Sequence, residues 1–108
     1  MGAVRGTIHA GVCGFVTEVI ARCDDSQHVS FDITTPCEKV GKLAEILPTV
    51  DAYEEIGSGF NGQVMTAVRQ CFEGCCSGCA VPAGVFKTMQ VAAKLALPQA
   101  VTIALEKL

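Results

Sequence analysis

Cysteines offer the clearest chemistry in this sequence. The chain has seven, and four of them fall between positions 71 and 79. Cys76 and Cys79 form a C-x2-C pair, a spacing that lets one tight turn bring two thiolates to a single metal ion, about 2.3 Å from each sulfur. Zinc ribbons carry two such pairs and this sequence has one, so the remaining ligands must come from other cysteines. The sequence favours zinc or an iron–sulfur cluster as the cofactor.

Further thiolates occur both within this run and outside it. Cys71 and Cys75 are the nearest. Cys13 stands at a predicted strand junction flanked by glycines, where a closely approaching backbone could present a thiolate to a buried ion. Cys37 falls in the first turn of a predicted helix, where the positive end of the helix dipole favours a thiolate. The candidate metal ligands are therefore Cys13, Cys37, Cys71, Cys75, Cys76 and Cys79.

Two other interpretations of the cysteines remain open. A C-x2-C pair ahead of a helix is also typical of thiol–disulfide redox proteins, although there it follows a strand, whereas Cys76 follows a predicted helix and another cysteine. Alternatively, the cysteines are small buried apolar residues of a non-catalytic structural or interaction domain. Four cysteines in nine positions are hard to explain by packing alone. No residue receives a catalytic role from the sequence, and whether the protein is an enzyme stays open.

The segment from Gly57 to Gly62 fits the pattern G-x-G-x-x-G of dinucleotide-binding proteins. That motif needs a strand before it and an acidic residue about twenty positions later. Residues 53–56 have a poor strand pattern, and no acidic residue occurs between Glu73 and Glu106. The sequence therefore predicts a plain flexible connection whose glycines serve turns with positive φ.

The isolated polar residues have ordinary explanations. We expect Cys23 to be an incidental thiol at a hairpin turn, and His9 and His28 to be solvated on strands. Glu54 and Glu55 are adjacent and do not face one another on a helix, so a solvated turn accounts for them.

The elements that must position these residues follow from hydrophobic periodicity. Alternation of apolar and polar residues predicts strands over residues 4–10, 15–22, 28–34 and 101–105, the second and third forming an antiparallel hairpin. Helical spacing predicts helices from Pro36 to Pro48, over 63–72, and from Pro82 to about Ala96. A capping box, in which Thr35 accepts from the amide of Glu38, would start the first helix.

This order of elements predicts a single α+β domain, residues 1–108, with about three helices packed on one face of a small, mostly antiparallel sheet. The sheet would have three N-terminal strands and one C-terminal strand. Its edges are open, and only Glu106 and Lys107 guard the last strand. We therefore expect a homodimer formed through a sheet edge or through the apolar face of a helix.

Composition excludes several classes of partner. Eight basic and eleven acidic residues give a net charge of −3 with no basic run, which argues against nucleic acid. Mean hydropathy is +0.42, yet no stretch of about 18 uncharged apolar residues would span a membrane. Arg5 and His9 interrupt any secretory h-region, and Gly6 replaces the Ser or Thr of a myristoylation signal. We expect a cytoplasmic protein.

Three segments carry a resemblance to a known family: Gly11-Val12-Cys13-Gly14-Phe15, Thr35-Pro36-Cys37, and Cys79-Ala80-Val81-Pro82, the last leading through a helix to Leu95-Ala96-Leu97-Pro98. Over nearly its whole length the chain resembles an uncharacterised family of small proteins from anaerobic bacteria and archaea. The resemblance implies a four-thiolate site made by Cys13, Cys37, Cys71 and Cys79. Cys75 and Cys76 depart from that pattern, so either the dispersed quartet or the local C-x2-C pair could bind. No activity comes with the resemblance.

Overall fold

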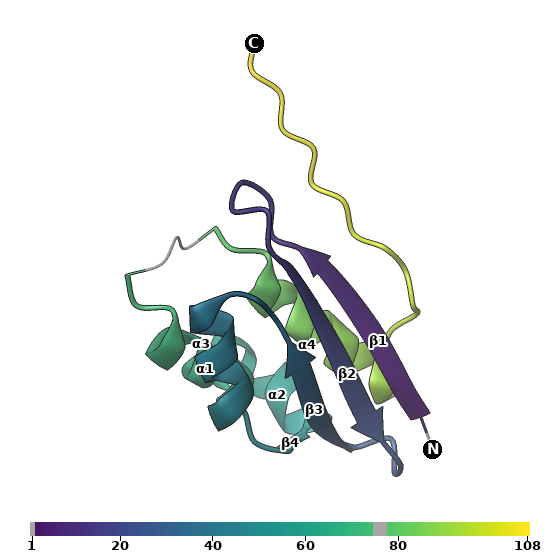
Figure 1. The fold of residues 1–108 in the computed structure, drawn as a ribbon. Helices are drawn as coiled ribbons and strands as arrows, with labels where there is room; N and C mark the ends of the chain where they lie inside the picture. The colour runs from purple at the N-terminus through teal and green to yellow at the C-terminus, as the bar shows by residue number, and fades with distance from the viewer. Residues whose placement is uncertain (1, 75–77) are drawn as a thin grey trace.

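The computed structural model describes residues 2–74 and 78–108. Within them, an antiparallel sheet contains β1 (Gly2–His9), β2 (Val16–Cys23), β3 (His28–Thr34) and β4 (Val50–Asp51), in that order across the sheet (Figure 1). The helices are α1 (Glu38–Ile46), α2 (Ala52–Ser58), α3 (Gln63–Cys71) and α4 (Val81–Ala92), with a 3-10 turn, η1, at Gly59–Asn61. The predicted α+β class is confirmed.

The first three strands form because their side chains alternate. In β3, Val29 is buried and Phe31 and Ile33 are half-buried, whereas Ser30 and Asp32 between them are exposed. β2 has the same alternation and pairs with both neighbours. Period-two patterning assigns one set of side chains to the core face, and here that face meets the helices. The predicted hairpin of residues 15–22 and 28–34 and the predicted strand over residues 4–10 are confirmed, with bounds displaced by at most two residues.

The helices supply the other layer of the core. α4 packs on β1 and β2, α1 packs on β3, and α3 lies against α1 and α4. Two small residues bring α4 close to the sheet, because a Cβ on Gly6 would overlap Thr88 and a Cβ on Gly84 would overlap Ile8. A smaller cluster of Leu43, Ala67 and Cys71 joins α1 to α3.

α4 ends earlier than predicted, at Ala92 and not at Ala96. Lys94 adopts φ 64° and its N–H donates to the Val91 carbonyl at 3.0 Å, while the N–H of Leu95 donates to the Gln90 carbonyl at 2.8 Å. This is a Schellman motif, in which a left-handed residue terminates the helix. The sequence hides the ending because lysine, and not glycine, occupies the left-handed position.

The predicted capping box at the start of α1 is wrong. The Thr35 hydroxyl accepts from the N–H of Cys37 at 3.1 Å and bonds to the buried Thr17 hydroxyl of β2 at 2.8 Å. The helix therefore begins at Glu38, with Cys37 as its N-cap residue, and within the described part of the chain no side chain caps it. Thr35 is drawn to the sheet, so its hydroxyl does not reach the amide of Glu38.

The predicted C-terminal strand is also wrong. In the structure, residues 97–108 contain neither helix nor strand, and their large apolar side chains are exposed: Leu97, Val101, Ile103, Leu105 and Leu108. The fourth strand is β4, whose two residues are too few to produce a detectable pattern. Alternation predicts which side chains share a face, but it does not supply the neighbouring strand.

None of the helices in residues 2–74 and 78–108 combines the length and the apolar character needed to cross a bilayer.

Candidate functional site

The segments that carry most of the candidate ligands lie at one end of the fold. Figure 1 places the β1–β2 turn, the entry into α1 and the described residues between α3 and α4, 72–74 and 78–80, toward the same end of the body of the protein. Cys13, Cys37 and Cys79 belong to these segments, and Cys71, the last residue of α3, directly precedes one of them. The topology therefore brings cysteines from distant parts of the sequence to the same end of the sheet.

Cys37 and Cys79 have similar positions before helices. Cys37 is the N-cap residue of α1, and Cys79 directly precedes Ala80, the N-cap residue of α4. Both side chains are half-buried and pack against the main core. Phe72 packs there too and also contacts the small cluster containing Cys71.

Cys71 is the most enclosed of the four. It ends α3, only 8% of it is exposed, and it packs with Leu43 and Ala67. Burial raises the pKa of the Cys71 thiol above its ordinary value, an effect that nearby Glu45 reinforces and Lys42 opposes. Cys71 is therefore a thiol at neutral pH, and a metal ion must displace its proton in order to bind.

A lysine joins the segment after Cys71 to the start of α1. Lys39 lies in the first turn of α1, and its Nζ donates to the Glu73 carbonyl at 2.6 Å. The same ammonium would lie 3.8 Å from a Cβ on Gly74, whose φ is 80°. Lys39 follows Cys37 by two residues and Glu73 follows Cys71 by two residues, so the segments after these two cysteines are in direct contact.

Cys13 differs from the expectation for a buried ligand. It lies in the β1–β2 turn between Gly11 and Gly14, which have φ values of 98° and 74°, and the N–H of Gly14 donates to the Gly11 carbonyl at 2.8 Å. Cys13 is exposed and Val12 beside it is fully exposed. The glycines form a solvent-facing turn, so they do not bring the backbone up against a buried ion.

The described residues include no group of three or more Cys, His, Asp or Glu side chains arranged to hold a metal ion. Cys75 and Cys76 lie outside the described residues, and with Cys76 so does the geometry of the C-x2-C pair. The fold brings together the segments that bear Cys37, Cys71 and Cys79, but it does not assemble a closed shell from them.

The glycine-rich segment is not the plain connection that the sequence predicts, because Gly57 and Ser58 end α2 and Gly59–Asn61 form η1, with a positive φ of 57° at Gly59. Residues 53–56, which the sequence predicts as a solvated turn, lie within α2, and Glu55 is only 2% exposed. Its carboxyl oxygens accept from the N–H groups of Gln63 at 2.9 Å and Val64 at 2.7 Å, at the start of α3. A phosphate would need these same amides. The sequence offers no signal for this contact, because Glu55 acts eight and nine positions ahead in the chain.

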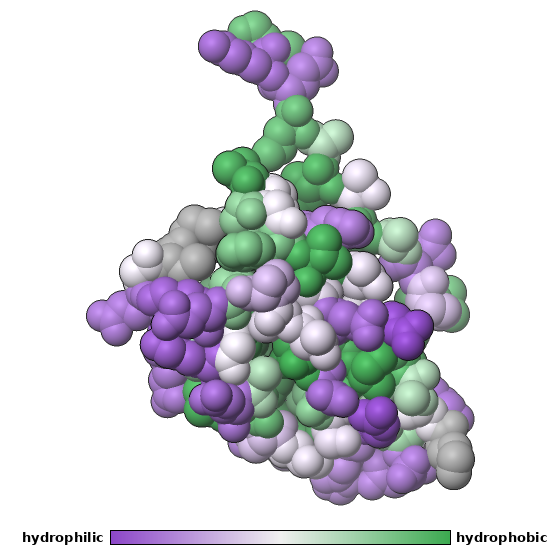
Figure 2. Space-filling model, in the orientation of Figure 1, coloured by the Kyte–Doolittle hydropathy of each residue, from purple (hydrophilic) through white to green (hydrophobic). Residues whose placement is uncertain are grey.

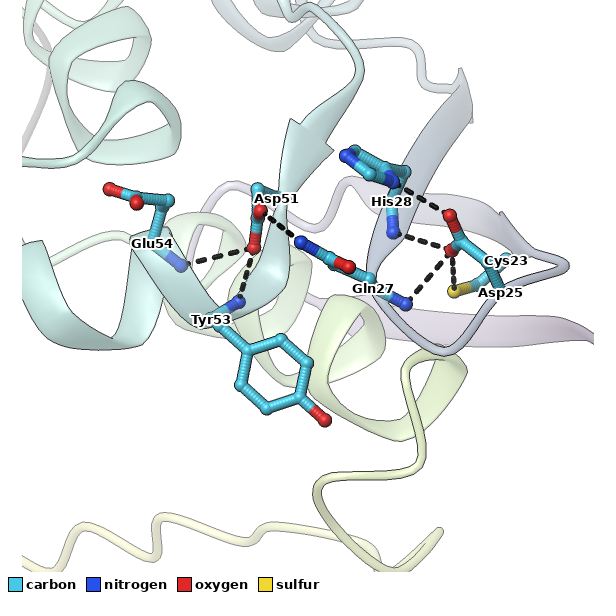
Figure 3. A network of polar contacts seen from close by, with 7 residues as sticks. All are labelled: Cys23, Asp25, Gln27, His28, Asp51, Tyr53 and Glu54. Atoms are coloured by element: carbon cyan, nitrogen blue, oxygen red, sulfur yellow. Dashed lines mark hydrogen bonds and ion pairs between the residues drawn. The ribbon is translucent and has the colours of Figure 1, made fainter.

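A second polar cluster, distant from most of the cysteines, surrounds the β2–β3 turn and β4 (Figure 3). One oxygen of Asp25 accepts from the N–H groups of Gln27 at 2.9 Å and His28 at 2.7 Å, and the other bonds to His28 Nδ1 at 2.7 Å. These bonds hold the pKa of Asp25 well below its usual range and raise that of His28. His28 is exposed, as the sequence predicts, but it is also hydrogen-bonded to Asp25, which the sequence does not predict.

Asp51 completes this cluster. Its Oδ1 accepts from the N–H groups of Tyr53 at 2.9 Å and Glu54 at 3.2 Å, and its Oδ2 accepts from Gln27 Nε2 at 2.6 Å. The bond from Gln27 is the main reason that the pKa of Asp51 is lowered. An open hollow of about 410 Å³ lies beside it, lined by Gln27, Asp51, Tyr53, Glu54, Gly57 and Ser58. These carboxylates hold a turn and a helix start in place.

Cys23, at the end of β2, contacts this second cluster. It is 5% exposed, and its Sγ lies 3.8 Å from Asp25 Oδ1. The sequence predicts an incidental thiol here, and the structure places Cys23 away from the segments that bear Cys37 and Cys71.

The fold and these contacts define a small α+β protein in which Cys13, Cys37, Cys71 and Cys79 lie at turns and helix ends toward one end of an antiparallel sheet, whereas Cys23 lies at the end of β2 beside the second cluster. The chain belongs to the family described as Family of unknown function (DUF6951), whose model matches residues 4–105. A search of curated proteins and a search of solved structures each found no match. Membership assigns no activity, so the residues themselves must carry any functional proposal.

Proposed function

We propose that the protein binds zinc or an iron–sulfur cluster through cysteine thiolates at the end of the fold that holds the start of α1. The preferred ligands are Cys13, Cys37, Cys71 and Cys79, with Cys75 and Cys76 as further candidates. The resemblance to a family of anaerobic bacteria and archaea with cysteines at the first four positions supports the same choice. Such a protein would stay in the cytoplasm, where thiols are kept reduced.

The observation that carries this proposal is the hydrogen bond from Lys39 Nζ to the Glu73 carbonyl. It fixes the segment after Cys71 against the first turn of α1, which Cys37 precedes. Two thiols 34 residues apart in sequence are thereby held on adjoining segments without a bond between them. An ion bound by both would join α1 to α3, and Cys79 would add α4.

The chemistry of the donors fits a thiophilic metal. Cys37 and Cys79 are half-buried, so they are accessible to an ion yet shielded from bulk water, and Phe72 shields the side toward Cys71. Cys13 lies in an exposed turn where a Cβ on Gly11 or Gly14 would meet nothing within 4 Å. Since the described thiols do not form a closed shell, loading must reposition some of them, and the open turn at Cys13 has the space to move.

Metal analysis of the full chain, purified without oxygen, tests the proposal. Stoichiometric zinc in a colourless protein supports a zinc site, and iron with acid-labile sulfide and visible absorption supports a cluster. Cys37→Ser and Cys71→Ser should each lower the metal content strongly. Cys23→Ser is the matched control, because that buried cysteine contacts Asp25 at the other cluster, and its metal content should equal that of the wild type.

Other outcomes contradict the proposal in distinguishable ways. If the protein contains neither zinc nor iron, but two thiols are oxidised and reduced reversibly and Cys79→Ser removes this behaviour, the protein is a thiol–disulfide redox protein. If all thiols stay inert and no metal is bound, it is a structural or interaction domain. Equal metal loss in Cys23→Ser would show that unfolding, and not ligand removal, explains the variants.

A further inference from the structure

The C-terminal segment has the pattern of a strand but no strand beside it. From position 101, Val101, Ile103 and Leu105 alternate with Thr102 and Ala104. The three large side chains are 61%, 74% and 91% exposed. Figure 2 shows this apolar segment standing clear of the body of the protein, and it extends the molecule to 45 Å against 27 and 24 Å in the other directions. An extended row of apolar side chains in water favours burial against another surface.

The sheet has an open edge of matching length. β1 is at the edge of the strand order, and it has eight residues, which span about 27 Å. The N–H of Ala10 donates to the Phe15 carbonyl, so the register makes the even-numbered residues of β1 the ones bonded to β2. The backbone N–H and C=O groups of Ala3, Arg5, Thr7 and His9 therefore point away from β2, toward the open edge.

Few of the usual devices protect this edge. β1 has neither proline nor lysine, and it pairs with β2 without interruption from Gly2 to His9. Proline, lysine and bulges are the features that natural sheets use to prevent a further strand from adding. Arg5 is the one charged residue of β1, and its Nε lies 3.5 Å from Glu18 Oε2 on the neighbouring strand.

We propose that residues 100–107 of each chain add as a strand to β1 of a second copy, forming a symmetric dimer by reciprocal exchange of the C-terminal segments. Eight residues cover the eight of β1. The alternation then places Val101, Ile103 and Leu105 together on one face of the extended sheet. Each strand addition satisfies outward backbone groups of β1, and twofold symmetry makes both contacts at once.

We expect the C-terminal segment to pair with β1 of a second copy and not with β1 of its own chain. In the described residues, no backbone hydrogen bond joins positions 96–108 to β1 of the same chain. The segment leaves the end of α4, passes Pro98 and projects beyond the body (Figure 1), so its apolar residues are presented outward. A homodimer also supplies the complementary edge and segment in equal numbers, so the assembly closes.

The mass of the full chain in solution, measured by sedimentation or light scattering over a concentration series, gives the first test. We expect a dimer, and a chain lacking residues 100–108 should be a folded monomer because those residues leave the core intact. Ile103→Lys should raise the dimer dissociation constant about a hundredfold. Ala104→Lys is the matched control on the opposite face and should change it little.

Mixing two variants gives the sharper test. Thr7→Pro removes one outward N–H of β1 while keeping the C-terminal segment, and the truncated chain keeps the edge while lacking the segment. Each alone should be monomeric, and together they should form a one-to-one heterodimer.

A full chain that is monomeric at its solubility limit overturns the proposal, as does a dimer that survives truncation. A series of species larger than a dimer would contradict the reciprocal exchange, because it would show that the chains join in open rows and not in closed pairs. If Thr7→Pro fails to fold, the contrast between Ile103→Lys and Ala104→Lys decides: equal dissociation constants reject strand addition, and a selective effect of Ile103→Lys supports it.

Discussion

The helices of this protein begin in two different ways. α2 and α3 begin beside carboxyl groups, since Asp51 accepts two backbone N–H groups of the first and Glu55 accepts two of the second. α1 and α4 begin at Cys37 and Ala80, and neither of these two N-cap residues caps its helix with its own side chain. At both of these starts a cysteine is at, or next to, the N-cap position.

The two kinds of helix start differ in how much the N-cap residue stabilises the helix. A serine, threonine, aspartate or asparagine at an N-cap stabilises a helix by about 1 kcal/mol over a residue that cannot accept the amide hydrogen. Asp51 is such a residue at the start of α2, and at the start of α3 the distant Glu55 accepts the amide hydrogens in place of the N-cap Gly62. At the start of α1, Cys37 is the N-cap residue and does not cap the helix with its side chain, so the helix lacks that stabilisation. The weak N-cap at Cys37 is compatible with the metal-binding role proposed for this thiol.

The largest expected effect on stability comes from Glu55, which accepts the first amide hydrogens of α3. In Glu55→Gln an amide nitrogen would face a backbone N–H at the start of α3, leaving a buried donor without an acceptor. We expect a loss of about 1.5–3 kcal/mol in the free energy of unfolding, measured by urea denaturation. Glu54→Gln is the control, because its side chain is exposed. Equal losses in the two variants would show that the cap is not what stabilises α3.

The next largest effect concerns the start of α1, where Cys37 is the N-cap residue. Cys37→Ser provides an N-cap acceptor in place of a thiol, so it should stabilise the metal-free protein by about 0.5–1 kcal/mol. In the metal-loaded protein the same change removes a proposed ligand and should destabilise it. Unfolding measured with and without a chelator checks this reversal of sign, and Cys37→Ala, which adds no acceptor, should not stabilise the metal-free form. Stabilisation of equal size in both conditions would remove Cys37 from the site.

The sequence predicted those parts of the fold that depend on local patterns. The strand at Val29, Phe31 and Ile33 and the helix that starts at Gln63 both have the period of their structure, and both are found. The ending of α4 and the C-terminal segment escaped prediction for different reasons. The first depends on a left-handed lysine, Lys94, and the second has a strand pattern without a strand partner.

The site was less predictable because its contacts connect distant positions. The sequence indicated which cysteines are candidates, but not that Lys39 would reach the carbonyl after Cys71. Glu55 shows the same limit, since a glutamate in a polar run gives no sign that it will be buried against a helix start. Pairings across 34 or 9 residues are set by packing of whole elements, and no local propensity encodes them.

A smaller effect concerns the contact between the two cysteine-bearing segments. Lys39→Met removes the bond to the Glu73 carbonyl while keeping the aliphatic stem, so the segment after Cys71 is no longer held against α1. We expect metal affinity to fall about fivefold, as measured by competition with a chelator. Lys87→Met, on the exposed side of α4, is the control and should bind like the wild type. Unchanged affinity in Lys39→Met would mean that this contact does not organise the ligands.

The smallest expected effect concerns the Asp25 carboxyl group in the β2–β3 turn and the pKa of His28, to which it is bonded. Its hydrogen bond and charge raise the pKa of His28 above the ordinary 6.5, and the bond from His28 holds the pKa of Asp25 below its ordinary 3.8. The histidine's contribution to stability is complete below pH 6.5 and is lost as the pH rises through the folded-state pKa. The contribution of Asp25 is complete above pH 3.8 and is lost as the pH falls. The pair therefore stabilises the turn most between these two values.

Asp25→Asn should return the pKa of His28 toward 6.5, and NMR titration of the imidazole protons measures it. Asp24→Asn is the control, because the bonds to His28 come from Asp25. If both variants lower the pKa of His28 equally, general surface charge and not the specific bond is responsible. A shift confined to Asp25→Asn would confirm that carboxyl groups on this side of the molecule act through the groups they bond. At the start of α1, by contrast, the N-cap residue Cys37 does not bond the helix amides through its side chain.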